Sequence, residues 1–182
     1  MDIFTLLMAC GPAVAPQTTT ALIVAESGGN PYAIGDNTSH RSYAPKTKMQ
    51  AIALATSLLN AGHRIDMGLT QISSPWLNTW RLSLDQVFGV CSNIRIGTEL
   101  LAYNYQKCAA TGTTKQSTLD CALSLYNTGT MARGYAYVAR VLRAAHAPTE
   151  LRSFPFPTAS IRHAAIGYGR LKFPNRSVLS FR

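Results

Sequence analysis

The sequence has few acidic side chains. Only 8 of its 182 residues are Asp or Glu, against 17 Lys and Arg, and the formal net charge is +9. This imbalance favours polyanionic partners, such as nucleic acid, anionic lipid or an acidic wall polymer. Acid–base catalysis by a carboxyl group must use one of the few acids present: Asp2, Glu26, Asp36, Asp66, Asp85, Glu99, Asp120 and Glu150.

The sequence also lacks the features of several protein classes. Its basic residues form no cluster interleaved with aromatic residues, so we expect no nucleic-acid binding. The apolar run over residues 3–9 is too short to cross a bilayer, and it follows an acidic residue where a secretory signal would have a basic segment. This run is either a degenerate or trimmed signal or the first helix of the core. We expect no transmembrane helix.

The cysteines do not form a metal-binding pattern. Cys10, Cys91, Cys108 and Cys121 include no C-x-x-C pair, and no histidine lies at zinc-finger spacing, so we expect neither a metal nor a cofactor. An even number of cysteines in a chain of low charge suits an oxidising compartment. Cys108 and Cys121 flank a polar loop and could form a disulfide, and Cys10 with Cys91 would then tie the N-terminal segment to the body. Free buried thiols are an equal alternative.

One stretch places a carboxyl group in apolar surroundings. Residues 21–25, Ala-Leu-Ile-Val-Ala, run directly into Glu26, and the Gly-Gly-Asn-Pro segment at 28–31 then ends the helix. A threonine among residues 18–20 can cap its start. Apolar neighbours and the C-terminal end of the helix dipole both disfavour a charged carboxylate, so the pKa of Glu26 should rise. A carboxyl group protonated near neutral pH can act as a general acid; the alternative is a glutamate that reaches solvent past the helix end.

The remaining patterns predict one mainly α-helical domain over residues 1–147 and a basic, proline-containing tail over 148–182. Residues 30–45 indicate a loop with a small hairpin. We expect further helices where apolar residues recur at helical spacing, at 48–61, 93–109, 117–126 and 134–145.

A short extended segment is expected over residues 64–73. Gly68 at its centre would let another part of the chain approach closely. Gln71 and Ser73 lie two residues apart and would face the same way, while Leu69 can face the core.

Three motifs, in their order and spacing, resemble the signatures of the soluble lytic transglycosylase family, relatives of goose-type lysozyme. They are Glu-Ser with Asn-Pro at 26–31, Gly-Leu-Thr-Gln-Ile at 68–72 and Ala-Leu-Ser-Leu-Tyr-Asn-Thr-Gly at 122–129, with a fourth match at 134–141. The family usually has methionine at the position of Thr70, near the sugar. The lead-in at 10–16 and the loop at 37–43 resemble the branch that serves type IV secretion and conjugation machines.

The resemblance implies a lysozyme-like single domain, mainly α, with a small β hairpin or extended segment near an active-site groove. It implies a periplasmic peptidoglycan lytic transglycosylase that acts on glycan strands, with type IV secretion or conjugation subunits as partners. Such enzymes cleave the bond between N-acetylmuramic acid and N-acetylglucosamine without water and leave an anhydro ring, so one carboxyl group suffices. A hydrolytic muramidase and a non-catalytic wall-binding assembly factor are the alternatives.

The roles that the resemblance implies centre on Glu26 as acid and then base. The substrate-binding residues would be Gln71, Ser73, Tyr126, Tyr135 and Asn127. Gln71 would bind sugar or orient Glu26, and Tyr126 would place its hydroxyl near Glu26. Asn127 could instead only close its helix, and Tyr135 could instead only fill the core.

Asp66 is the other acid close in sequence to a matched motif. It could be the second carboxylate of a hydrolytic variant, or it could cap a loop.

Overall fold

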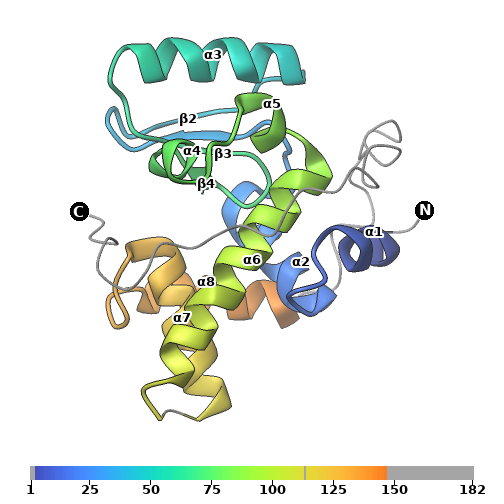
Figure 1. Cartoon of the computed structure of the whole chain (residues 1–182), viewed down its shortest axis with the longest axis vertical. Coiled ribbons are helices and arrows are strands. Elements are labelled where there is room, and N and C mark those ends of the chain that lie inside the picture. Colours follow the sequence, from blue (N-terminus) through green and yellow to red (C-terminus); the bar gives the residue numbers. More distant parts are fainter. Residues whose placement is uncertain (1–2, 113, 147–182) are drawn as a thin grey trace.

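The computed structural model describes residues 3–112 and 114–146, so the tail expected over 148–182 lies outside the described residues. A small sheet with three helices forms one part of the molecule, and the other helices form the second part (Figure 1). The long helix α6 runs from the sheet to the far end of the helical part (Figure 1). The helices are α1 (Ile3–Cys10), α2 (Pro16–Ser27), α3 (Lys48–Asn60), α4 (Pro75–Trp80), α5 (Leu84–Val87), α6 (Val90–Ala109), α7 (Lys115–Thr128) and α8 (Tyr135–His146). The prediction of a mainly α-helical fold with a small β element is confirmed.

The sheet is antiparallel and has the strand order β2-β1-β3-β4. Its strands are β1 (Ile34–Asp36), β2 (Arg41–Tyr43), β3 (Ile65–Met67) and β4 (Ile72–Ser73). β1 and β2 form the hairpin expected within residues 30–45. In the register of β3 and β4, Asp66 lies opposite Ser73, so these two polar residues meet across the strands.

The end of α2 is as predicted, but its start is not. Gly28 has φ 59°, the left-handed conformation that suits glycine, and its N–H donates to the carbonyl of Val24 at 3.1 Å. The helix begins at Pro16, a residue favoured in the first turn because it has no N–H to leave unpaired. Thr19 therefore lies inside the helix and donates to the carbonyl of Ala15 at 3.2 Å, so no threonine caps the start.

Asn93 of α6 fixes the turn between β3 and β4. Its side-chain amide donates to the carbonyls of Met67 and Val87, at 3.1 and 2.8 Å. The side-chain oxygen Oδ1 of Asn93 accepts a hydrogen bond from the N–H of Thr70 at 2.8 Å. Gly68 has φ 78°, and a Cβ there would lie 2.2 Å from Nδ2 of Asn93. The close approach expected at Gly68 is confirmed.

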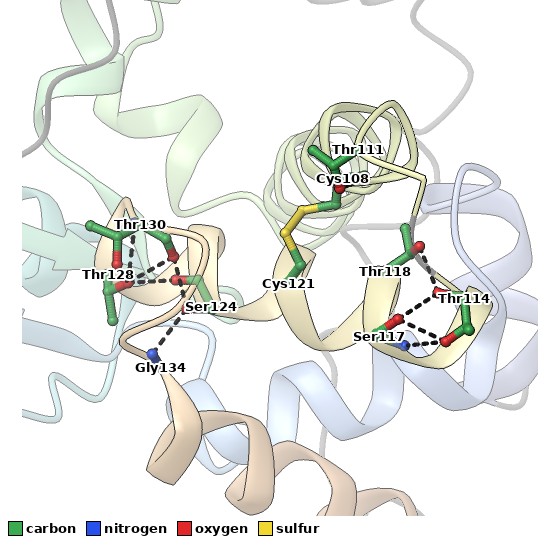
Figure 2. Close-up of a disulfide and its surroundings, with 10 residues drawn as sticks. All are labelled: Cys108, Thr111, Thr114, Ser117, Thr118, Cys121, Ser124, Thr128, Thr130 and Gly134. Atoms are coloured by element: carbon green, nitrogen blue, oxygen red, sulfur yellow. Dashed lines mark hydrogen bonds between the residues drawn. A yellow bond between two sulfur atoms is a disulfide. The ribbon is translucent and has the colours of Figure 1, made fainter.

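Both expected disulfides are present. Cys10–Cys91 ties α1 to α6, so the N-terminal apolar run is a core helix with Leu6 and Leu7 buried. Cys108–Cys121 joins α6 to α7, as Figure 2 shows. Within residues 3–112 and 114–146, no helix combines the length and apolar character that crossing a membrane requires.

Candidate active site

A cleft of about 410 Å³ lies between the sheet and the α6–α7 pair. Asn37, Asp66 and Ser73 line it on the side of the sheet. Asn104 and Lys107 of α6, and the end of α7 at residues 125–129, line the opposite side. Glu26 enters the same cleft from the last turn of α2. The fold therefore brings together elements that are far apart in the sequence.

The carboxyl group of Glu26 is the most perturbed acid of this cleft. Its pKa is raised from 4.5 to about 7, mainly by burial and to a smaller extent by the negative charge of Asp66. A hydrogen bond from Tyr137 and the positive charge of Arg140 act in the opposite direction. The predicted rise in the pKa of Glu26 is confirmed, and the group can exchange a proton near neutral pH.

Tyr137 of α8 donates its hydroxyl hydrogen bond to Oε1 of Glu26. Burial and the neighbouring Glu26 raise the pKa of Tyr137 far above its usual range, so this hydroxyl stays protonated and is a donor. The guanidinium of Arg140, one helical turn later, lies 5.1 Å from the centre of the Tyr137 ring. A cation over an aromatic face is attracted to it, which helps to hold the ring in place.

Ser27 ties the helix of Glu26 to the glycine-containing turn. Its hydroxyl donates to the carbonyl of Leu69 at 2.8 Å, 42 residues along the chain. Leu69 is fully buried, so the turn itself is anchored in the core. The position of Glu26 relative to this side of the cleft is therefore set by the residue next to it.

Tyr126 lines the cleft, but its hydroxyl donates to the carbonyl of Thr70 at 2.7 Å and not to Glu26. Burial raises its pKa, and the charge of Glu26 contributes, so the two groups lie within electrostatic reach. Thr70 was expected near the sugar, and this is wrong. Its side chain is completely buried, donates to Oδ1 of Asn93 at 2.7 Å and packs on Gly97, because it turns towards α6.

Gln71 and Ser73 both line the cleft, as expected. Gln71 does not lie on an extended strand, because its φ is 49° and β4 starts at Ile72. Its side-chain amide donates to the backbone carbonyls of Gly68 and Ala33, at 2.9 and 3.2 Å. These bonds hold the turn beside Glu26, and a role for Gln71 in binding sugar stays a prediction.

Asp66 shares the cleft with Glu26. Burial raises the pKa of Asp66, while hydrogen bonds from Asn37, at 2.8 Å, and from Ser73 lower it. Its effect on the pKa of Glu26 shows that the two carboxyl groups interact. Among the described residues, no group of three or more His, Cys, Asp and Glu side chains is placed to hold a metal.

Asn127 lines the cleft, whereas Tyr135 does not. Tyr135 is 77% exposed at the start of α8, so it does not fill the core, and a role for it in binding sugar stays a prediction. Two positions along an α-helix correspond to a rotation of about 200° around its axis, so Tyr137 faces inward on α8 and Tyr135 faces outward. Tyr137 was not predicted from the sequence, although the spacing of Tyr137, Val138 and Val141 is that of one buried helix face. Asn104 and Lys107, which lie three residues apart on α6, were not predicted either.

Comparison with known proteins identifies relatives. The Transglycosylase SLT domain family matches residues 7–139. Protein virB1 of Agrobacterium fabrum is 34% identical over 138 residues, which cover 75% of this chain and 56% of that protein. The type IV secretion system protein virB1 of Brucella suis is 31% identical over 149 residues, 78% of this chain and 63% of that protein. The chain thus spans less than two thirds of the length of these relatives. No solved structure matches this chain significantly.

Proposed function

This chain belongs to the transglycosylase SLT domain family, and we propose that it is a peptidoglycan lytic transglycosylase with Glu26 as its single acid and base. The proposed reaction cleaves the β-1,4 bond between N-acetylmuramic acid and N-acetylglucosamine. The observation that carries the proposal is the buried carboxyl group of Glu26, which lies in the wall of the cleft and has a pKa of about 7.

In the first step, protonated Glu26 donates its proton to the glycosidic oxygen, and the bond from this oxygen to C1 of the muramyl residue breaks. The hydroxyl on C6 of the same residue then attacks C1, and carboxylate Glu26 takes the hydroxyl proton. The product carries a 1,6-anhydro ring, no water is consumed, and Glu26 ends protonated. A pKa near the working pH suits a group that must both give and accept a proton.

Tyr137 stabilises Glu26 between these two steps. Its hydroxyl donates to Oε1, and a hydrogen bond to a carboxylate is stronger than one to the neutral acid. In the proposed reaction, the other oxygen of Glu26 then transfers the proton. Asn104 and Asn127 line the cleft with side-chain amides, which suit the acetamido groups of both sugars.

A hydrolytic muramidase is the second candidate, because Asp66 lies in the same cleft. Glycosidases that use water carry a second carboxyl group about 5 to 10 Å from the acid. In this alternative Asp66 would be the nucleophile or the general base. Asp66 already accepts hydrogen bonds from Asn37 and Ser73, so a structural role accounts equally well for its burial.

We propose that the cell-wall cut serves a type IV secretion or conjugation apparatus in the periplasm. The names of the virB1 relatives from Brucella support this setting. Two disulfides within the described chain fit an oxidising compartment.

Digestion of purified sacculi, followed by mass spectrometry of the released muropeptides, tests the proposal. A transglycosylase releases 1,6-anhydro products, whereas reducing ends would favour the muramidase. Glu26→Gln should lower the rate by about 10²–10⁴-fold, the usual contribution of a general acid. Glu99→Gln, an acid of α6 outside the cleft, is the matched control. Binding to sacculi without any release would contradict both enzymatic readings and favour a wall-binding factor.

A further inference from the structure

Ser124 lies in α7 close to the candidate active site but does not line the cleft. Its side chain is buried, with 3% of its surface exposed. Its hydroxyl donates to the carbonyl of Thr130 at 2.7 Å and accepts the N–H of Gly134 at 2.9 Å, as Figure 2 shows. One buried side chain therefore holds both ends of the segment that connects α7 to α8.

Gly134 packs directly on Ser124. A Cβ at position 134 would lie 2.8 Å from Cα and 2.9 Å from Oγ of Ser124, closer than real Cβ contacts. The carbonyl of Gly134 accepts a hydrogen bond from the N–H of Val138 at 2.8 Å, which belongs to the first turn of α8. The start of α8 is thus placed by its contact with one serine.

Tyr137 is the third residue of α8, one turn after Gly134. Because a hydrogen-bonded helical turn moves as a unit, a displacement of Gly134 also displaces Tyr137. We propose that Ser124 is a positioning residue: by holding the start of α8, it keeps the hydroxyl of Tyr137 in hydrogen-bond contact with Glu26. The effect of this positioning on the reaction rests on the proposed role of Glu26 as the acid, whereas the contact itself does not.

The same hydrogen-bond network reaches the wall of the cleft. The hydroxyl of Thr128 donates to the carbonyl of Ser124 at 2.8 Å and lies 3.0 Å from the hydroxyl of Thr130 (Figure 2). Thr128 lines the cleft. Ser124 thus joins the cleft wall at the end of α7 to the start of α8 in one hydrogen-bonded unit.

The groups that face Glu26 determine whether its pKa should rise or fall when the start of α8 is no longer held by Ser124. Tyr137 and Arg140 come from α8, Tyr126 from α7 and Asp66 from β3. The two groups on α8 both lower the pKa of Glu26, whereas Asp66 raises it. Burial, the largest contribution, also raises it. Ser124 does not line the cleft, so loss of its hydroxyl leaves Glu26 buried but weakens both lowering contributions, and the pKa of Glu26 should rise further.

The titration of Glu26 can be followed directly, because the chain has three glutamates, Glu26, Glu99 and Glu150. Glutamate labelled with ¹³C at the carboxyl carbon gives three signals by NMR, and Glu26→Gln assigns one of them. We expect Ser124→Ala to raise the midpoint of Glu26 in the same direction as Tyr137→Phe. We also expect kcat to fall about tenfold with little change in KM, since small displacements near the reacting groups are costly.

A matched control comes from the same helix. Ser117 is exposed in the first turn of α7, and its hydroxyl donates to the carbonyl of Thr114 at 3.0 Å, far along the helix from α8. Ser117→Ala should leave the midpoint of Glu26 unchanged. Ser124→Ala should shift the midpoint less in a Tyr137→Phe background than in the wild type, because the serine acts through the tyrosine.

A wild-type midpoint in folded Ser124→Ala would overturn the inference, and so would an equal shift in both backgrounds. Should Ser124→Ala fail to fold, Gly134→Ala provides the second variant, because it keeps the hydroxyl but pushes α8 away from it. That variant must move the midpoint of Glu26 away from the wild-type value. The titration does not depend on turnover, so an inactive wild-type protein would contradict the proposed function and leave the positioning inference intact.

Discussion

Tyr137 and Glu26 lie 111 residues apart in the chain and meet through one hydrogen bond, from the tyrosine hydroxyl to a carboxylate oxygen. The bond joins α8 to α2, and these two helices pack together in the helical part of the molecule. Glu26 is thereby oriented by a residue outside the motif that contains it.

Activity should fall as pH rises through about 7, because the acid step needs protonated Glu26.

The free energy of unfolding should also fall as pH rises. Folding raises the pKa of Glu26 from 4.5, so the stability it contributes is complete below that pH and is lost as pH rises through about 7. Urea unfolding from pH 4 to 8 measures how the free energy of unfolding changes with pH. Glu26→Gln, which lacks the titrating carboxyl group, is the reference. A wild-type slope no steeper than that of the variant would contradict the raised pKa.

Asp66→Asn should move the alkaline fall of activity to lower pH. The charge of Asp66 raises the pKa of Glu26, and its removal takes that contribution away. In a transglycosylase the variant keeps substantial turnover, whereas a muramidase that uses Asp66 would lose it. The pH dependence of kcat/KM on soluble glycan chains, with product masses, separates the two outcomes.

Gly68→Ala should destabilise the protein by about 2–4 kcal/mol, since it adds a clash to an unfavourable backbone angle. A Cβ at this position would lie 2.2 Å from Nδ2 of Asn93, and φ is 78°. Gly62 is the matched control, because its φ is 80° but no atom lies within 4 Å of a Cβ there. Gly62→Ala should cost about 1 kcal/mol, the price of the backbone angle alone. Similar losses for both variants in urea unfolding would show that the contact with Asn93 is unimportant.

The two disulfides should differ in their contribution to stability. Cys10–Cys91 spans 81 residues and Cys108–Cys121 spans 13. Loop-closure entropy gives about 4.5 kcal/mol for the first and about 3 kcal/mol for the second. Chemical unfolding of the two double Cys→Ser variants measures the difference, and a larger loss at the shorter loop would contradict this entropic account.

Several features followed from the sequence because they depend on neighbouring residues. The apolar run before Glu26 and the glycine after Ser27 predict a helix that ends beside a desolvated acid. Gly68 predicted that another part of the chain packs closely on this turn, and the side chain of Asn93 does so. Capping, glycine conformations and helical periodicity all act over a few residues, so a local pattern is enough to recognise them.

Other features were decided by tertiary structure. Thr70 faces α6 and not the cleft, Tyr135 faces solvent, and Tyr137 reaches Glu26. Each depends on the angle and register at which two distant segments pack, and a rotation of one residue moves a helical side chain by about 100°. The sequence by itself thus determined that a helix would end next to an acid with apolar neighbours. Only the packing of α8 on α2 determined which tyrosine would hold it, because side chains of equal chemistry two positions apart lie on different helix faces.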